Sequence, residues 1–259
     1  MFIRGDDVDY GERLNQAGYK VYCLGGVGVW HLHFLEKPIS WIVYYVFRNH
    51  LVLLSTSHKN RNWDKTSISK QLRNTVFYNL CQYDYGHAAL VLLAIEDFLK
   101  GPEYIQNTKA SDILQNVLAT YKKYNSKLNP ECVKQMEPTK RQADTKINNY
   151  LKKISLNYQQ GILKKKGSDS FEIIHGEYPP SWKHVPEKNG YILHDTGRNV
   201  KRIFERNQEH AENLDIEREN VFKQFSEQFN QVAEKFLAYE DTLHSKEYWE
   251  EYFKTNECL

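Results

Sequence analysis

The pattern of apolar and polar positions predicts a mostly helical chain. Apolar residues recur three and four positions apart in most segments, and this spacing places them on one face of a helix. Helices are expected over residues 8–17, 39–55, 68–82, 86–100 and 109–124, and a long amphipathic helical region over 200–253. Gly18 and Gly101-Pro102 follow two of these segments, as is typical of helix ends, and Asp6 or Asp7 is placed to cap the first helix.

Two regions favour strands instead. Residues 19–30 are rich in β-branched and aromatic side chains but are interrupted by three glycines, which predicts two short strands joined by a tight turn. Residues 171–175 and 191–194 are strand candidates separated by a proline-containing loop, and together they predict a small hairpin.

Composition limits the classes of partner and compartment. The 259 residues are 41% apolar, which supports a buried core. Lys plus Arg (35) nearly balance Asp plus Glu (33), so the charge indicates no nucleic-acid partner. The four cysteines form no C-x-x-C pair, which argues against a zinc site or a disulfide framework and favours core packing in a reducing cytoplasm. Residues 39–54 are too few to span a bilayer, so no membrane-spanning helix is expected there. We expect a cytoplasmic protein, with peripheral binding at the inner face of the membrane as the alternative.

Acidic residues open the first helix, and two histidines follow it. Asp6, Asp7 and Asp9 lie in its first turns, and His31 and His33 would share one face if their segment is extended. Carboxylates at a helix start ordinarily complement the helix dipole, and a histidine near a strand end is ordinarily structural. These residue types alone leave the structural and functional interpretations open.

Order and spacing favour the functional interpretation. The relevant segments are Phe2-Ile3, Asp6-Asp7-x-Asp9, Arg13, Gly18-Tyr19, Val29-Trp30-His31, Phe47-Arg48-Asn49-His50-Leu51-Val52 and Ile95-Glu96-Asp97-Phe98-Leu99-x-Gly101-Pro102-Glu103. In this order, over roughly residues 2–125, they resemble motifs of the inverting family 2 glycosyltransferases of GT-A fold. Within that family they are most similar to the polymerising galactofuranosyltransferases of bacterial cell-surface galactan.

The resemblance implies a role for each site residue. Asp7 matches the general base that deprotonates the acceptor hydroxyl, and Asp6 would lie beside it in the acceptor-binding wall. His31 matches a histidine ligand of a divalent metal, Mg²⁺ or Mn²⁺, and Trp30 and His33 are candidate acceptor contacts. The implied donor is UDP-galactofuranose, and the implied acceptor is a cell-surface or lipid-linked glycan.

The chain also departs from the family pattern. The family places its nucleotide-binding strands and an Asp-x-Asp metal motif before this segment, whereas only five residues precede Asp6. We therefore expect an α/β remnant of a GT-A domain, its C-terminal part only, over residues 1–60. A helical domain over 61–166 and a small hairpin with long amphipathic helices over 167–259 would follow. The missing N-terminal half is an expected partner, a homo-oligomer is another, and no transfer is expected from the chain alone.

Two alternatives to the leading function stay open. One is a non-catalytic glycan-binding or assembly module, and the other is a rhamnosyltransferase-like family 2 enzyme. Arg48 is expected to be a buried helix residue paired with an acid or a backbone carbonyl, with acceptor positioning as the alternative.

Overall fold

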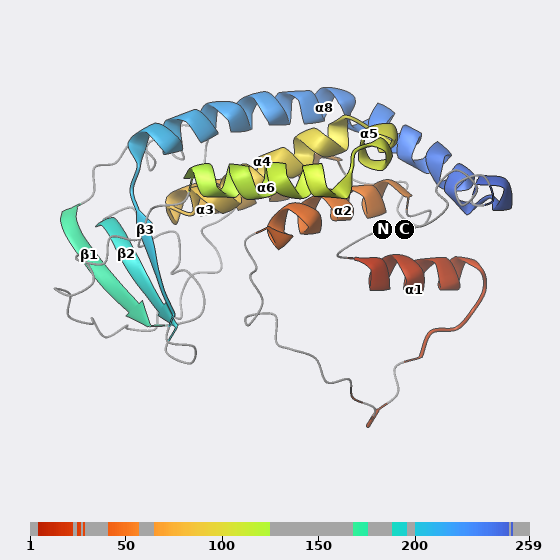
Figure 1. Ribbon diagram of the computed structural model, residues 1–259, viewed down its shortest axis with the longest axis horizontal. Coiled ribbons are helices and arrows are strands. Elements are labelled where there is room, and N and C mark those ends of the chain that lie inside the picture. The colour runs from red at the N-terminus through yellow and green to blue at the C-terminus, as the bar shows by residue number, and fades with distance from the viewer. Residues whose placement is uncertain are drawn as a thin grey trace. The chain divides into compact units, whose positions relative to one another are not determined.

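The computed structural model describes residues 5–22, 25–26, 28, 41–56, 65–124, 168–175, 188–195, 200–248 and 250. These residues are mostly helical, with one three-stranded sheet (Figure 1). The helices are α1 (Asp6–Gln16), α2 (Ile42–Thr56), α3 (Lys65–Cys81), α4 (Tyr85–Leu99), α5 (Pro102–Asn107), α6 (Ala110–Tyr124) and α8 (Gln208–His244). The strands are β1 (Ser168–His175), β2 (Lys188–Asp195) and β3 (Val200–Glu205). Within the described residues, the helices expected from the sequence are thus confirmed, except at the start of the last one.

The chain divides into two compact units. Unit 1 comprises Met1–Gln71, Leu90–Leu118 and Asn220–Leu259, and unit 2 comprises Leu72–Ala89 and Ala119–Glu219. The three-part division expected from the sequence stays a prediction.

Helix α1 ends as its sequence predicts but begins differently. Gly18 adopts a left-handed conformation (φ 83°). The N–H of Tyr19 donates to the carbonyl of Leu14 (2.9 Å), and that of Gly18 donates to the carbonyl of Asn15 (3.1 Å). These two bonds are a Schellman motif, which favours glycine at this position. At the start, the capping position is Gly5 and no side chain caps the helix, so the expected cap by Asp6 or Asp7 is wrong.

The strand pair expected after α1 is wrong in its first half. Residues 19–22 belong to no strand, and Gly25 and Gly26 form a turn. Gly28 also belongs to no strand. The other residues of that expected pair, and residues 29–33 of the segment expected to carry the two histidines, lie outside the described residues.

The core of unit 1 is built from helices that bury their apolar faces. Phe98 of α4 stacks on Phe236 of α8 (ring centroids 5.1 Å apart) and lies against Phe229 of the same helix (5.9 Å). Phe225, Phe229 and Phe236 recur at helical spacing and are all buried. The amphipathic stripe predicted from the sequence is therefore the core face of α8.

The sheet of unit 2 corrects two expectations. β1 and β2 are parallel, so the two predicted strands form no hairpin (Figure 1). The antiparallel partner of β2 is β3, whose residues were expected to be helical. Pairing of Ile203 with Ile192 and stacking of Phe204 on Tyr191 (4.8 Å) favour a strand there. These contacts join two consecutive strands, and the helical spacing of apolar residues does not report them.

Unit 2 also joins α3 to α4 through an unusual turn. Tyr83 follows α3 with φ 58°, a conformation that is uncommon for a residue other than glycine. Its side chain is buried, and the hydroxyl of Tyr191 donates to the carbonyl of Gln82 (2.8 Å). Asp84 then caps α4 by accepting a hydrogen bond from the N–H of His87 (3.3 Å).

Candidate functional site

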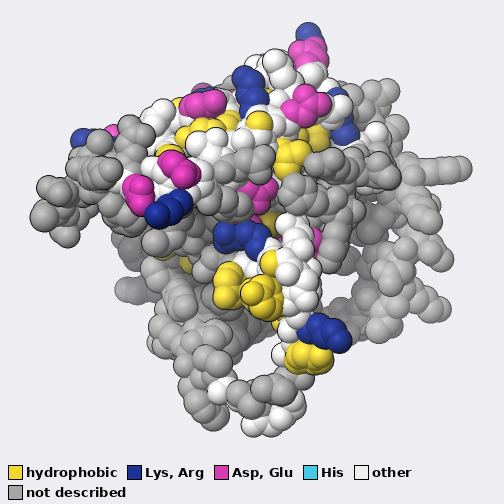
Figure 2. Space-filling model, turned by 90° about the vertical axis from the view of Figure 1, so that its right-hand side faces the viewer, with side chains coloured by type: hydrophobic (Ala, Val, Ile, Leu, Met, Phe, Trp, Pro, Cys, Tyr) yellow, Lys and Arg dark blue, Asp and Glu magenta, His cyan; other side chains and the backbone are white. Residues whose placement is uncertain are grey.

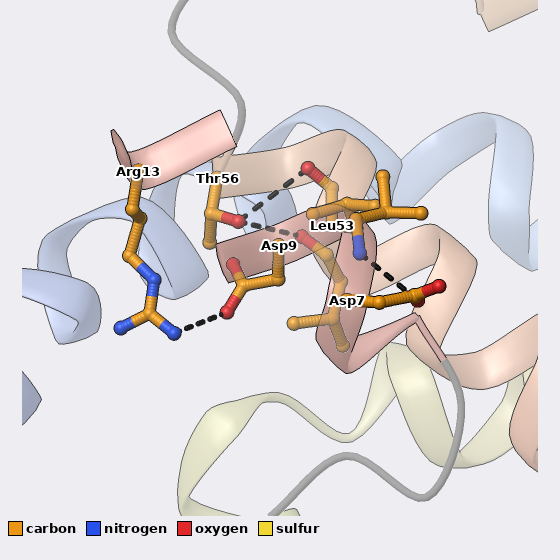
Figure 3. Close-up of polar contacts among 7 residues, drawn as sticks. Asp7, Asp9, Arg13, Leu53 and Thr56 are labelled. Carbon is orange, nitrogen blue, oxygen red and sulfur yellow. Dashed lines mark hydrogen bonds and ion pairs between the residues drawn. The ribbon is translucent and has the colours of Figure 1, made fainter. Parts of the chain in front are cut away.

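Asp7 is the candidate base, and it lies in the first turn of α1 (Figure 3). Its side chain is exposed, and its Oδ1 accepts a hydrogen bond from the backbone N–H of Val8 (2.9 Å). Among the described residues, no side chain donates a hydrogen bond to this carboxylate. The carboxylate is therefore accessible to an incoming hydroxyl group and lies at the end of the helix where the dipole favours negative charge.

The other described acid of the motif has a different environment. Asp9 forms an ion pair with Arg13, one helical turn further on, at 2.7 Å (Figure 3). The Asp9 side chain is 15% exposed and that of Arg13 is 44% exposed, so this pair is partly screened and worth only a few tenths of a kcal/mol. Its chemical consequence is that Arg13 neutralises Asp9 rather than Asp7.

Most of the predicted site cannot be placed around Asp7. The side chain of Asp6 and all of Trp30, His31 and His33 lie outside the described residues. Among the residues that are described, no group of three or more His, Cys, Asp or Glu side chains could hold a metal ion. The described part of the chain therefore does not fit a metal centre, and the metal ligation expected of His31 stays a prediction.

A second polar centre joins α2 to α4 in unit 1. Arg48 is only 5% exposed, and its Nε and Nη2 donate to Oδ1 of Asn49 (3.1 and 2.9 Å). Its Nη1 donates to the hydroxyl of Tyr44 (3.4 Å), which donates in turn to Oδ2 of Asp97 (2.6 Å). Lys100 donates to the other carboxylate oxygen of Asp97 (2.7 Å).

The burial of Arg48 agrees with its structural interpretation, but its partners differ from the acid or backbone carbonyl that was expected. The guanidinium is buried, as expected, but its partners are an amide and a hydroxyl, and it also lies over the rings of Tyr44 (5.2 Å) and Tyr45 (4.9 Å). Burial raises the pKa of the Tyr44 hydroxyl well above its ordinary value, which keeps it protonated as the bridge to Asp97. Sequence reasoning missed Tyr44, although its spacing of four residues from Arg48 was a usable signal.

Unit 2 contains a third buried polar centre without catalytic features. Arg218 is 1% exposed and lies 2.7 Å from a carboxylate oxygen of Asp215 and 3.2 Å from one of Glu219. Burial raises the pKa of the neighbouring Cys81 thiol to about 12. A thiol that stays protonated at neutral pH is a poor nucleophile, which agrees with the expected role of this cysteine in core packing.

Comparison with known proteins relates part of the chain to glycosyltransferases. No family model matches the chain. A stretch covering 40% of it is 35% identical over 108 residues to the galactofuranosyltransferase GlfT2 of Mycolicibacterium smegmatis. It is also 34% identical over 113 residues to the galactofuranosyltransferase GlfT2 of Mycobacterium tuberculosis. The galactofuranosyltransferase-like relationship expected from the motifs is thereby supported for this stretch. The chain spans about a sixth of the length of these curated relatives.

The membrane question can be addressed only for the helices that the structure describes. None of them is both long enough and apolar enough to cross a bilayer.

Proposed function

We propose that this chain supplies the acceptor side of a galactofuranosyl transfer site, within the C-terminal part of a GT-A domain. The observation that carries the proposal is the sequence relationship to two galactofuranosyltransferases over two-fifths of the chain. The ordered motifs around Asp7, Arg48 and Asp97 support the same assignment. The donor would be UDP-galactofuranose, and the acceptor a cell-surface or lipid-linked glycan.

The chemistry assigned to Asp7 is proton transfer. Its carboxylate takes the proton of the acceptor hydroxyl as that oxygen attacks the anomeric carbon, while the bond from this carbon to the diphosphate oxygen breaks on the opposite side. The electron pair of the breaking bond leaves with the diphosphate, and the configuration at the anomeric carbon is inverted. An exposed carboxylate whose described partner is one backbone N–H suits this role, because a base must come within hydrogen-bond reach of the hydroxyl.

The remaining groups of such a site are not found among the described residues. A divalent metal would neutralise the leaving diphosphate when bound, and His31 is the ligand that the motif suggests. We therefore propose that transfer also requires the polypeptide that corresponds to the unmatched part of the relatives.

The test is a transfer assay with a matched pair of variants. This chain is combined with the M. smegmatis galactofuranosyltransferase from which the stretch matching it has been deleted, here called the deletion chain. UDP-galactofuranose and a galactan oligosaccharide are then supplied. Asp7→Asn is expected to lower kcat roughly 10²–10⁴-fold, the contribution typical of a general base. Glu12→Gln, which removes another carboxylate of α1, is the control and should leave the rate unchanged. Full activity of the Asp7→Asn chain would overturn the assignment of the base.

A non-catalytic glycan-binding module is the second candidate. Tyr10, Tyr19 and Tyr22 are all more than half exposed, and exposed aromatic rings can stack on the flat faces of sugars. Calorimetry of the chain with galactan oligosaccharides tests this candidate, because a glycan-binding module binds them without any donor. A rhamnosyltransferase-like activity is separated from the leading proposal by screening donors in the transfer assay.

A further inference from the structure

The start of α1 lacks the capping side chain that begins other helices of this chain. In the described residues, three residues that directly precede a helix accept a hydrogen bond from the backbone N–H three positions further on. The pairs are Asp84 with His87 (3.3 Å), Asn207 with His210 (2.9 Å) and Ser245 with Tyr248 (3.1 Å). The equivalent pair in α1 is Gly5 with Val8, and glycine has no side chain that could accept this bond.

The N–H that such a cap would hold is bonded to Asp7 instead. The N–H of Val8 donates to Oδ1 of Asp7 (2.9 Å), its neighbour in the sequence (Figure 3). Acidic side chains (magenta) also lie at the surface beside basic ones (dark blue) in Figure 2, so exposure alone does not set Asp7 apart. The bond from Val8 holds one carboxylate oxygen in place and leaves the other, Oδ2, to take a proton from an incoming hydroxyl.

Gly5 also determines how the chain enters α1. Its φ of 83° and ψ of 4° lie in the left-handed region, whereas capping residues normally have an extended backbone. The carbonyl of Gly5 accepts the N–H of Asp9 (2.8 Å), which is the first hydrogen bond of the helix. A Cβ atom at position 5 would meet no atom within 4 Å, so the left-handed backbone, and not a lack of space, favours glycine here.

We propose that Gly5 is a positioning residue for Asp7. Its left-handed backbone sets the first turn of α1, and its lack of a side chain leaves the Val8 N–H to the Asp7 carboxylate. A base must come within hydrogen-bond reach of the hydroxyl, and a displacement of about 1 Å can lower a rate on the order of 100-fold. This inference rests on the proposed function, and it adds the residue that holds the base in place.

The experiment replaces Gly5 in the full chain by semisynthesis. A synthetic peptide of residues 1–22 is joined to a recombinant chain that begins at Cys23, a ligation that leaves the sequence unchanged. L-alanine and D-alanine at position 5 have the same atoms, but only D-alanine favours the left-handed region. In the transfer assay with the deletion chain, Gly5→Ala should lower kcat on the order of 10- to 100-fold with KM little changed. The D-alanine chain should transfer at the wild-type rate.

Gly5→Ser separates the position of the base from the stability of the helix. Serine gives α1 an ordinary capping residue, which competes with Asp7 for the Val8 N–H. Hydrogen exchange of the Asp9 amide should therefore be no faster than in the wild type, while kcat falls as in Gly5→Ala. Gly18→Ala is the matched control, because Gly18 has the same φ of 83° and the same free space at the opposite end of α1. It should speed exchange of the Tyr19 amide and leave kcat unchanged.

A second measurement needs no sugar transfer. The synthetic peptide carries ¹⁵N at Val8 alone, so one amide signal reports on this hydrogen bond. In the wild-type chain the signal should shift on Asp7→Asn, because the Val8 N–H is bonded to that side chain. In the Gly5→Ser chain the same substitution should shift it much less. Equal shifts in the two chains would overturn the proposal.

The transfer assay separates this inference from the proposed function. A D-alanine chain as slow as Gly5→Ala, or a Gly5→Ser chain with full activity, would overturn positioning by Gly5, and an inactive Asp7→Asn chain would still support the base. Full activity of Asp7→Asn would contradict the base assignment instead. In that case, and if the wild type transfers no sugar, the Val8 signal alone decides whether Gly5 positions the carboxylate.

Discussion

Helices α1 and α3 end with the same hydrogen bonds but with very different residues. In α3, the N–H of Asp84 donates to the carbonyl of Asn79 (2.9 Å) and that of Tyr83 to the carbonyl of Leu80 (3.1 Å). These bonds repeat the pattern found around Gly18 of α1. At α1 the left-handed position is an exposed glycine, and at α3 it is a buried tyrosine.

The comparison separates two ways of ending a helix. Gly18 adopts its conformation without steric cost, so local sequence is sufficient there. Tyr83 carries a strain of order 1–3 kcal/mol, which persists only when surrounding packing compensates for it. The packing is visible: Arg206 lies over the Tyr83 ring (5.7 Å), and the ring of Tyr85 is nearby (6.3 Å).

The largest expected effect comes from removing the side chain that anchors the α3–α4 turn. Tyr191→Ala deletes a ring that is 1% exposed and stacked on Phe204, and it also removes the hydrogen bond to Gln82. We expect the free energy of unfolding to fall by about 3–5 kcal/mol, as measured by urea denaturation. Tyr191→Phe, which keeps the ring, should cost only about 1 kcal/mol. Equal losses for the two variants would contradict the packing role of the ring.

Tyr83 itself allows strain and packing to be measured separately. Tyr83→Ala should lower the free energy of unfolding by about 3 kcal/mol, because it removes a buried ring and retains the left-handed backbone of a non-glycine residue. Tyr83→Gly should be more stable than Tyr83→Ala by about 1 kcal/mol, since glycine relieves the backbone strain. If the alanine variant is the more stable of the two, the strain at this position is not real.

Gly18 offers the matched measurement at the end of α1. A Cβ atom at this position meets no atom within 4 Å, so Gly18→Ala introduces backbone strain without a steric clash. The free energy of unfolding should fall by about 1 kcal/mol, the same alanine–glycine difference as at position 83. If α1 does not contribute to the stability of the folded chain, Gly18→Ala would leave the free energy of unfolding unchanged. Hydrogen exchange of the Tyr19 amide measures the stability of this helix end directly.

The smallest effect is the contribution of the buried Cys81 thiol to the loss of stability at alkaline pH. Burial raises the pKa of the Cys81 thiol from 9.0 to about 12 and that of the Tyr83 hydroxyl from 10.0 to about 12. At a pH above the pKa values that these groups have in the unfolded chain, the folded state binds more protons than the unfolded state. The free energy of unfolding is therefore unaffected below about pH 9 and falls as the pH rises towards 12. Near pH 10, ionisation of Cys81 should lower the free energy of unfolding by about 1 kcal/mol. Urea denaturation at about pH 8 and about pH 10 measures this fall, and the fall should be smaller by that amount in Cys81→Ala. An unchanged pH dependence in that variant would show that the thiol is not the group that titrates.

The contrast between a helix end set by local sequence and one set by surrounding packing also explains which parts of the fold the sequence could predict. Helix ends at Gly18 and Gly101 and the apolar stripe of α8 depend on residues that are close in the sequence, and each is confirmed. The parallel pairing of β1 with β2 and the left-handed Tyr83 depend on contacts between distant segments, so no local pattern reports them. At the candidate site, the assignment of Asp7 as the base stays a prediction, and the pairing of Asp9 with Arg13 became clear only in the structure.

The bridge between α2 and α4 has a consequence for how this sequence can vary. Asp97 contacts Lys100 directly and faces Arg48 through a single hydroxyl, so one carboxylate serves two cations. Replacing Asp97 alone leaves a buried guanidinium without the acid that balances it, and this costs more than exchanging both members for uncharged residues. We therefore expect positions 48 and 97 to tolerate change as a pair but not one at a time.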